Sequence, residues 1–418
     1  MSIRKRRWPV ALEGIIANLL LGALLTWSVF RQPLLKLFPA WTEGMLSVVF
    51  SFHNVSTCLG IWFGGWISRR YSRRKLFFVF GLMLLVGLGG IALLPVSMPG
   101  LSFVLLLLLY TVIAAFGIGF GINLVQSATL AWFPDHTGLM SGGLYMALGF
   151  SSFLLAALSR ITLPLLGVKL AFAGIGLLIF IVALLILADP KALTLPAESQ
   201  SSAAKPDKGV PPKIMLRSLP FWLLIIWNGS LRAIGFILLD HAASISVAFA
   251  STALVGMLIS PANAFGSLSL GGLTDRLGLR KNMLVVSMLA VASALCLIFG
   301  GIYKITVAII LGLIFGGMAY GGSSSTYAAS TRLIFGEKYF SANFGYTNFS
   351  LVLGALISTF SGKILDMFGG NYNSIFVMVI ILLVPTLFCA LTFYKTNPQP
   401  MTEEDTGPCE TLKSEAIE

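Results

Sequence analysis

Long apolar runs separated by short polar segments recur along the whole chain. Each run holds about 20 residues with few charges, which is the length an α-helix needs to cross the ~30 Å hydrocarbon core of a bilayer. The chain is therefore predicted to be an all-α membrane protein, and an even number of spans places both termini on one side. We predict twelve transmembrane helices, near residues 10–30, 43–67, 76–95, 102–130, 139–162, 167–188, 221–245, 252–273, 282–301, 305–330, 341–363 and 373–394.

The composition agrees with this pattern. Of the 418 residues, 57% are hydrophobic and 11% are charged, whereas soluble proteins carry about 25% charged residues. So few charges do not cover the surface of two or three water-soluble domains. The expected surroundings are a lipid bilayer.

The formal net charge of +12 is explained by topology. The N-terminal tail, alternate loops, the central segment and the C-terminal tail hold 21 of the 28 basic residues. This asymmetry predicts that both termini are cytoplasmic. The expected location is the cell inner membrane, in which the protein is multi-pass. Because topology explains the positive charge, no nucleic-acid partner is expected. The opposite loops hold six basic residues, Arg31, Lys36, Arg160, Lys169, Lys304 and Lys363.

A stretch rich in Pro, Ser, Ala and Lys interrupts the apolar pattern near the middle of the chain. Such a composition is typical of a flexible linker, and it leaves six spans on each side. The predicted organisation is an N-terminal six-helix bundle (1–189), a cytoplasmic linker (190–218), a C-terminal six-helix bundle (219–395) and a disordered cytoplasmic tail (396–418).

The two halves repeat each other weakly. Residues 65–75 follow the second span and residues 271–281 follow the eighth, with similar patterns of Gly, Arg and Lys. A second pair, 131–134 and 333–336, follows the fourth and tenth spans. Duplicated six-helix halves place a substrate site near the bilayer midplane between them, and rocking of the halves gives alternating access.

Residues 271–281 match Gly-x-x-x-Asp-Arg-x-Gly-x-Arg-Lys, the signature loop of the major facilitator superfamily, so the chain resembles that superfamily. The first copy departs from the signature, because Arg69 replaces the acid and Ser72 the glycine. The resemblance implies the major facilitator fold, function as a monomer, and a gating loop with Asp275, Arg276 and Arg280.

A narrower resemblance, to the oxalate:formate antiporter family, is carried by segments 26–30, 132–142, 221–224, 320–322 and 335–343. That family carries small organic anions by exchange or with protons. Its two dicarboxylate-binding cations fall on Ser267 and near Leu351 in this chain, and neither is basic. Oxalate is therefore not the expected substrate, because two buried charges would lack partners.

Arg232 is the leading site candidate, because it lies about 16 Å into the seventh span. A buried arginine is costly and normally faces the bundle interior, where its guanidinium can hold a carboxylate through two parallel hydrogen bonds. The alternative is a structural arginine that bonds carbonyls or pairs with an acid on another span. We expect further substrate contacts from polar residues of the same interior, Asn123, Gln126, Asn263, Ser267, Tyr320, Ser324, Tyr346 and Asn348.

Three titratable residues are candidates for proton coupling. His53 lies halfway through the second span, and Asp240 and His241 lie near the outer end of the seventh. Burial can move the pKa values of such groups toward neutral pH. The alternatives are a packed, hydrogen-bonded histidine for His53 and a wetted helix end for the Asp240–His241 pair.

The predicted function is secondary active transport of a small organic anion, with a monocarboxylate expected because one mid-membrane cation suits one carboxylate. The partner ion is a proton or a counter-anion. No cofactor, metal or enzymatic activity is expected, because the cysteines lack metal-ligand spacing and no phosphate-binding Gly-Lys loop is present. Two alternatives remain: an exporter of lipophilic compounds in which Arg232 is structural, and a non-transporting membrane sensor.

Overall fold

The computed structural model describes residues 3–22, 27–68, 70–188, 209–250 and 253–396. Over these residues the chain is helical, and its only extended pairing is an isolated bridge between Gly209 and Gly336. Arg69, most of the predicted linker (189–208) and nearly all of the predicted tail (397–418) lie outside the described residues.

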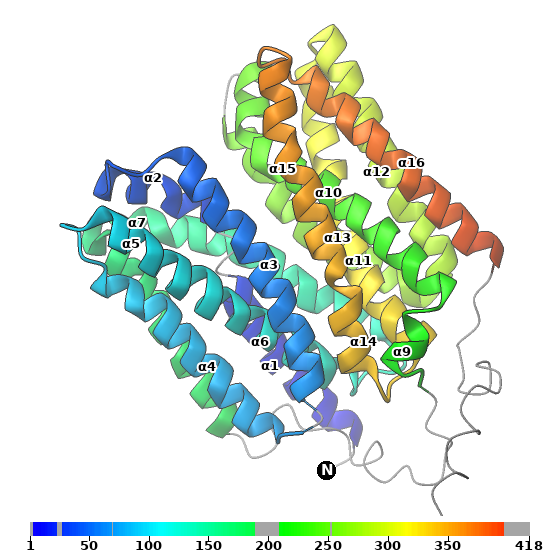
Figure 1. Cartoon of the computed structure of the whole chain (residues 1–418). Coiled ribbons are helices and arrows are strands. Elements are labelled where there is room, and N and C mark those ends of the chain that lie inside the picture. Colours follow the sequence, from blue (N-terminus) through cyan, green and yellow to red (C-terminus); the bar gives the residue numbers. More distant parts are fainter. Residues whose placement is uncertain (1–2, 23–26, 69, 189–208, 251–252, 397–418) are drawn as a thin grey trace, which may run out of the picture.

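The first half of the chain forms one bundle of helices (Figure 1). Its elements are α1 (Ile3–Leu21), α2 (Trp27–Leu37), α3 (Glu43–Ile67), α4 (Arg73–Gly89), the 3-10 helix η2 (Gly90–Leu93), α5 (Pro99–Leu106), the π-helix η3 (Leu107–Ala114), α6 (Ala115–Leu130) and α7 (Thr137–Ala188).

The second half forms the other bundle. It consists of α9 (Pro212–Met215), α10 (Leu219–Ala250), the 3-10 helix η4 (Ala253–Leu258), α11 (Ile259–Leu277), α12 (Leu279–Tyr303), α13 (Thr306–Phe335), α14 (Phe340–Thr347), α15 (Phe349–Met367) and α16 (Asn373–Thr396).

The helices account for the predicted spans. Within the described residues, nine helical segments are long and apolar enough to cross a membrane. Helices also form the described residues of the other three predicted spans: α1 and α2 overlap 10–30, the first part of α7 covers 139–162, and η4 with α11 covers 253–273. The prediction of an all-α membrane protein is confirmed.

Glycines make the sharp turns between consecutive spans. Gly167 has φ +70° and divides α7 into the predicted fifth and sixth spans. Gly278 (φ +78°) separates α11 from α12, and Gly336 (φ +79°) ends α13. A positive φ is costly for residues with a Cβ, so these positions let the chain reverse within one or two residues.

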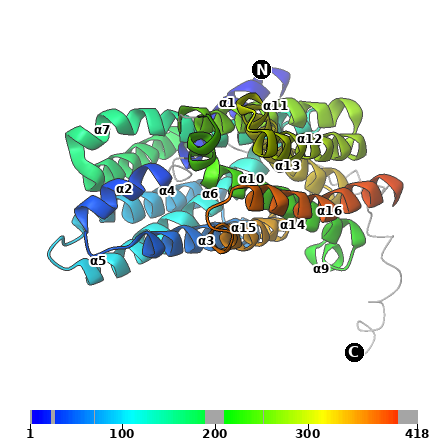
Figure 2. The ribbon, with the colours of Figure 1, turned by 90° about the horizontal axis from the view of Figure 1, so that it is seen from above.

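The two bundles lie side by side, in contact at the end that carries the N terminus and diverging toward the other end (Figure 1 and Figure 2). Backbones meet directly at the closed end. A Cβ on Gly138 of α7 would lie 2.3 Å from the carbonyl oxygen of Gly271 in α11, and a Cβ on Gly65 of α3 would lie 2.3 Å from that of Ser341 in α14. The repeat relates these two contacts, so the same close approach is made twice.

The end of the predicted linker packs against the second bundle. Val210 is fully buried, donates its N–H to the Phe335 carbonyl (2.9 Å) and accepts from the Asn343 side chain (2.9 Å). Residues 209–218 therefore belong to the folded part of the chain.

Candidate functional site

Arg232 lies near the middle of α10, where the two bundles meet, and is only 5% exposed. Its Cβ faces Gly354 of α15, where a Cβ would lie 2.8 Å away. Its guanidinium carbon is 5.7 Å from the ring centroid of Tyr327 in α13, and its charge acts on the side chain of Tyr145 in α7. The guanidinium is thus enclosed by helices of both bundles.

No carboxylate neutralises this cation within the described part of the chain. Arg7 pairs with Asp135 and Arg332 pairs with Glu337, while the rings of His136 and His241 lie within 4 Å of Asp135 and Asp240; none of these carboxylates pairs with Arg232. The Nε of Arg232 is buried and has no hydrogen-bond partner among the described residues. A buried, incompletely bonded guanidinium is unfavourable by itself and leaves a place for an anion.

The surroundings of Arg232 are otherwise aromatic and apolar. Tyr320 packs its ring against Gly235 of α10, with its centroid 5.7 Å from that of Phe236. Cys58 of α3 lies within electrostatic range of Arg232. It packs with Phe236, Leu351 and Ala355. The cation is therefore surrounded by aromatic rings and apolar side chains.

Tyr145, beside Arg232, is a candidate that the sequence did not point to. It lies on one face of α7 with Gly138, Gly142 and Gly149, at spacings of three or four residues. All three glycines face the second bundle, against Gly271, Ser267 and Asn263. The glycine spacing was the available signal, because residues at i, i+4 and i+7 share a helix face.

Asn123, predicted to contact substrate, joins the two bundles. Its Nδ2 donates to the carbonyls of Ile61 and Ser341 (2.9 Å each), and its Oδ1 accepts from the Ser341 hydroxyl (2.5 Å). The structure therefore gives the Asn123 amide a role at the closed end, and its predicted contact with substrate stays a prediction.

Gln126 differs from Asn123, although both lie on α6. Both amide atoms of Gln126 are buried without a partner among the described residues, and the same holds for Asn18 of α1. The two helices run antiparallel, because Gly14 faces Thr129 and Leu21 faces Gly121. Asn18 and Gln126 lie between these two contacts and therefore at about the same level of the bundle. Buried amides without partners are rare in proteins, which marks this level as a place for water or ligand.

The other predicted substrate contacts bond within their own helices or across the bundle contact. Ser267 donates to the Asn263 carbonyl (2.9 Å), and Asn263 lies beside Gly149 of the other bundle. Ser324 donates to the Tyr320 carbonyl (3.2 Å).

Two predicted contacts lie at the end of α14, Tyr346 in its last turn and Asn348 directly after it. The Asn348 side chain donates to the Phe344 carbonyl (2.8 Å), and its own carbonyl accepts from Cys58 (3.4 Å). The Tyr346 ring meets that of Trp62 edge-on at 6.2 Å between centroids. Both residues therefore lie where α3 and the second bundle touch.

The histidines lie apart from Arg232 in different settings. His53 is buried, its ring stacks on Tyr110 of the π-helix η3 at 5.3 Å, and its Nδ1 has no partner among the described residues. His241 is hydrogen-bonded to the Ser361 hydroxyl (3.0 Å) and lies 3.9 Å from the exposed carboxylate of Asp240. The described residues hold no group of three or more His, Cys, Asp or Glu that would bind a metal ion.

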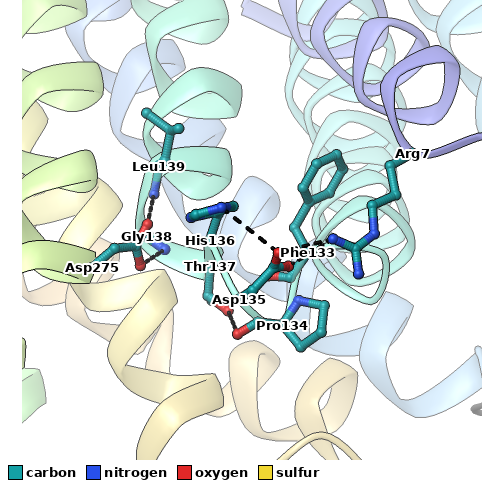
Figure 3. Close-up of polar contacts among 9 residues, drawn as sticks. All are labelled: Arg7, Phe133, Pro134, Asp135, His136, Thr137, Gly138, Leu139 and Asp275. Atoms are coloured by element: carbon teal, nitrogen blue, oxygen red, sulfur yellow. Dashed lines mark hydrogen bonds and ion pairs between the residues drawn. The ribbon is translucent and has the colours of Figure 1, made fainter. Parts of the chain in front are cut away.

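Asp275 connects the bundles at the closed end (Figure 3). Its two carboxylate oxygens accept from the backbone N–H groups of Gly138 (2.7 Å) and Leu139 (2.8 Å), at the start of α7. A carboxylate is favourable at a helix N-terminus because the first N–H groups there are unpaired and the helix dipole is positive. Arg280 donates to the Tyr394 carbonyl (3.2 Å), while Arg276 is exposed.

An ion pair lies beside this contact. Asp135, in the turn between α6 and α7, accepts from Arg7 at 2.9 and 3.0 Å (Figure 3). Burial alone would raise the pKa of the Asp135 carboxyl, but hydrogen bonds from its own backbone N–H and from Arg7 outweigh burial and lower that pKa. Asp135 is therefore a carboxylate at neutral pH and ties the start of α1 to this turn.

Two repeated helical bundles that enclose a buried cation, which has no carboxylate partner among the described residues, indicate the class of protein, a polytopic membrane transporter. The model of the Major Facilitator Superfamily matches residues 11–239 and 229–409. The chain belongs to this superfamily of secondary transporters.

Individual relatives are distant. The uncharacterized MFS-type transporter YhjX of Escherichia coli (strain K12) is 23% identical over 367 residues, which cover 85% of this chain and 87% of that protein. The oxalate:formate antiporter of Oxalobacter formigenes is 26% identical over 353 residues, or 81% of this chain and 80% of that protein.

Solved structures share the fold at lower identity. The proton:xylose symporter XylE has a TM-score of 0.74 at 13% identity and is matched over 97% of this chain and 99% of that one. The transporter FucP in its outward conformation has a TM-score of 0.67 at 12% identity, over 92% and 98%. These likenesses concern the fold alone.

Proposed function

We propose that the protein carries a small organic anion, with a monocarboxylate as its preferred class, by alternating access. The observation that carries this proposal is Arg232, a buried cation between the bundles without a carboxylate partner in the described residues. A carboxylate that binds there gains charge-assisted hydrogen bonds in a site of low dielectric.

A single charge on the substrate follows from the rest of the site. The distant relative named oxalate:formate antiporter supports an anion as substrate. The family's two dicarboxylate-binding positions fall here on Ser267, which bonds its own helix, and Leu351, which is in an apolar cluster. A second carboxylate would therefore be buried without a counter-charge.

Coupling uses a proton or a counter-anion. His53 is the better proton candidate, because its Nδ1 is buried without a partner in the described structure. Asp240 and His241 form the second candidate, near the diverging ends of the bundles.

The gate lies at the closed end, where Asp275 and Arg276 end α11 and Arg280 begins α12. With both termini in the cytoplasm of a cell with an inner membrane, the closed end is cytoplasmic and the diverging ends face outward. The protein then works as a monomer, because one chain supplies both halves of the site.

The test is uptake of labelled mono- and dicarboxylates into proteoliposomes, with and without a proton gradient. We expect saturable uptake of a monocarboxylate and a rise of about tenfold to a hundredfold in its KM for Arg232→Gln, the equivalent of a lost hydrogen bond to a charged group. Arg232→Lys keeps the charge but loses the two parallel hydrogen bonds. Its KM should therefore lie between those of the wild type and Arg232→Gln.

The control is Lys395→Gln, which removes an exposed charge at the end of α16. It should transport like the wild type. Thermal melting of each purified variant separates a lost site from a misfolded protein. Full saturable uptake by a folded Arg232→Gln would contradict the proposed carboxylate contact.

A further inference from the structure

The segment that joins α3 to α4 carries an unusual concentration of positive charge. Residues 69–75 hold five basic residues and no acid. In the repeated segment of the other half, residues 275–281 hold three basic residues and Asp275. Both segments lie at the closed end of the molecule, so they differ in charge and not in location (Figure 1).

The acid in the second segment is already occupied. Asp275 accepts from the start of α7, and Arg280 donates to the Tyr394 carbonyl. In the first segment, by contrast, the side chains of Arg70, Arg74 and Lys75 are exposed. Arg70 and Lys75 take part in no ion pair among the described residues.

The aromatic residues beside these cations are of the kinds that concentrate at membrane interfaces. Trp66, at the end of α3, is 45% exposed, and the guanidinium carbon of Arg70 lies 4.0 Å from its ring centroid. Tyr71 is 55% exposed. Tryptophan and tyrosine concentrate at membrane interfaces, where the ring meets the acyl chains and the polar edge meets water.

The apolar belt begins directly beyond the basic residues. Phe78 and Val79 are each 44% exposed and lie about one turn further along α4 than Lys75. In a membrane-spanning helix such side chains face acyl chains, so the exposed cations lie where the hydrocarbon ends. Along the protein surface the apolar side chains are thus followed by aromatic and then basic ones. A phospholipid has the same order, from acyl chains through the polar interface to the headgroup phosphate.

We propose that Arg70, Arg74 and Lys75, with Trp66 and Tyr71 beside them, form a binding site for anionic phospholipid headgroups on the N-terminal side of the membrane. The headgroup phosphate accepts hydrogen bonds from the guanidinium groups, which match its geometry, while the acyl chains lie along α3 and α4. The 275–281 segment, with its internal acid, is the weaker site. The proposal does not depend on which substrate the protein carries.

The experiment titrates the full-length, detergent-solubilised protein with phosphatidylglycerol or phosphatidylcholine and counts bound lipids by native mass spectrometry. We expect the wild type to prefer phosphatidylglycerol and to lose that preference as salt rises, because exposed charges are screened. Each neutralised basic residue should weaken the association about fivefold, as expected for a cation near an anionic surface.

The chain offers a matched pair of variants. Arg70→Gln/Arg74→Gln/Lys75→Gln should lose the preference, whereas Arg276→Gln/Arg280→Gln/Lys281→Gln should retain most of it. Gel filtration and melting of both variants check folding, and the salt dependence of the wild type tests the idea without any variant.

Three outcomes would overturn the inference. They are equal binding of both lipids by the wild type, equal losses in the two triple variants, and full displacement of phosphatidylglycerol by inorganic phosphate. The last result would indicate a site for a soluble anion.

Discussion

The guanidinium of Arg232 is costly to bury, and no carboxylate of the described residues pairs with it. Placing an arginine at mid-membrane costs about 2.5 kcal/mol or more, and its Nε has no partner in the described structure. The contacts with Tyr145 and Tyr327 stabilise the cation without neutralising it. A bound anion would supply the missing interaction, so occupancy and stability should rise together.

Gln126 is the second residue whose burial calls for an explanation. Both of its amide atoms are buried without a partner among the described residues, and such atoms cost roughly 1–3 kcal/mol each. For Gln126→Leu we therefore expect a melting temperature equal to or above that of the wild type, together with reduced anion uptake. Melting curves and uptake measured on the same preparation check both parts.

The matched variant is Ser330→Ala, because the Ser330 hydroxyl donates to the Thr326 carbonyl of its own helix (2.6 Å). Its uptake should equal that of the wild type. A clear loss of stability in Gln126→Leu would show that the amide holds the fold together, and the level of Asn18 and Gln126 would then not be a place for ligand or water.

Among the elements, α7 and α11 form the clearest functional pair. The carboxylate of Asp275, in the last turn of α11, caps the first turn of α7 in the other bundle. In the repeat-related position the first half has Arg69, outside the described residues. There the Ser68 and Ser341 hydroxyls meet at 3.0 Å, beside the Asn123 amide. The closed end is thus held by a charged contact and by a neutral one.

The charged contact predicts a shift in the conformational equilibrium. Asp275→Ala removes two hydrogen bonds to a helix N-terminus, and lost caps cost about 0.5–2 kcal/mol. We expect the closed end to open more often, seen as a larger distance between spin labels on Ser72 and Lys395. Asp366→Ala, which removes an exposed carboxylate of α15, should leave the distance unchanged. An unchanged distance in Asp275→Ala would mean that the neutral contact is sufficient.

For the whole molecule, the decisive feature is the direct backbone contact between the bundles. In Gly138→Ala the added Cβ would lie 2.3 Å from the Gly271 carbonyl oxygen, and backbone atoms on both sides have little freedom to move. The bundles must separate at this end, so we expect opening there and slower exchange between the two orientations. Spin-label distances and initial uptake rates measure these effects.

A control for this substitution exists within the same helix. A Cβ on Gly174 of α7 would meet nothing within 4 Å, so Gly174→Ala should be neutral or stabilise the helix by up to about 1 kcal/mol. If both alanine variants behaved alike, the close approach at Gly138 would not be what holds the bundles together.

Much of the fold was predictable from the residues alone. Apolar runs of membrane length and turn glycines such as Gly278 determine where helices lie, because a helix in lipid must satisfy its backbone internally. The repeated segments 65–75 and 271–281 indicated the two halves. The sequence did not reveal that residues 209–218 pack against the second bundle, since their composition resembles that of a free linker.

The candidate site was predictable only in part, for a physical reason. A charge such as Arg232 is conspicuous by itself within an apolar helix, because its burial is costly wherever the helix packs. Small polar residues carry no such signal: Asn123 joins the bundles, whereas Gln126, three residues later, has buried amide atoms without partners in the described structure. The sequence by itself determined the spans, the repeat and the key cation. Only the packing of α6, α7, α10 and α13 decided which polar groups meet it, because hydrogen-bond partners in a bundle come from helices far apart along the chain.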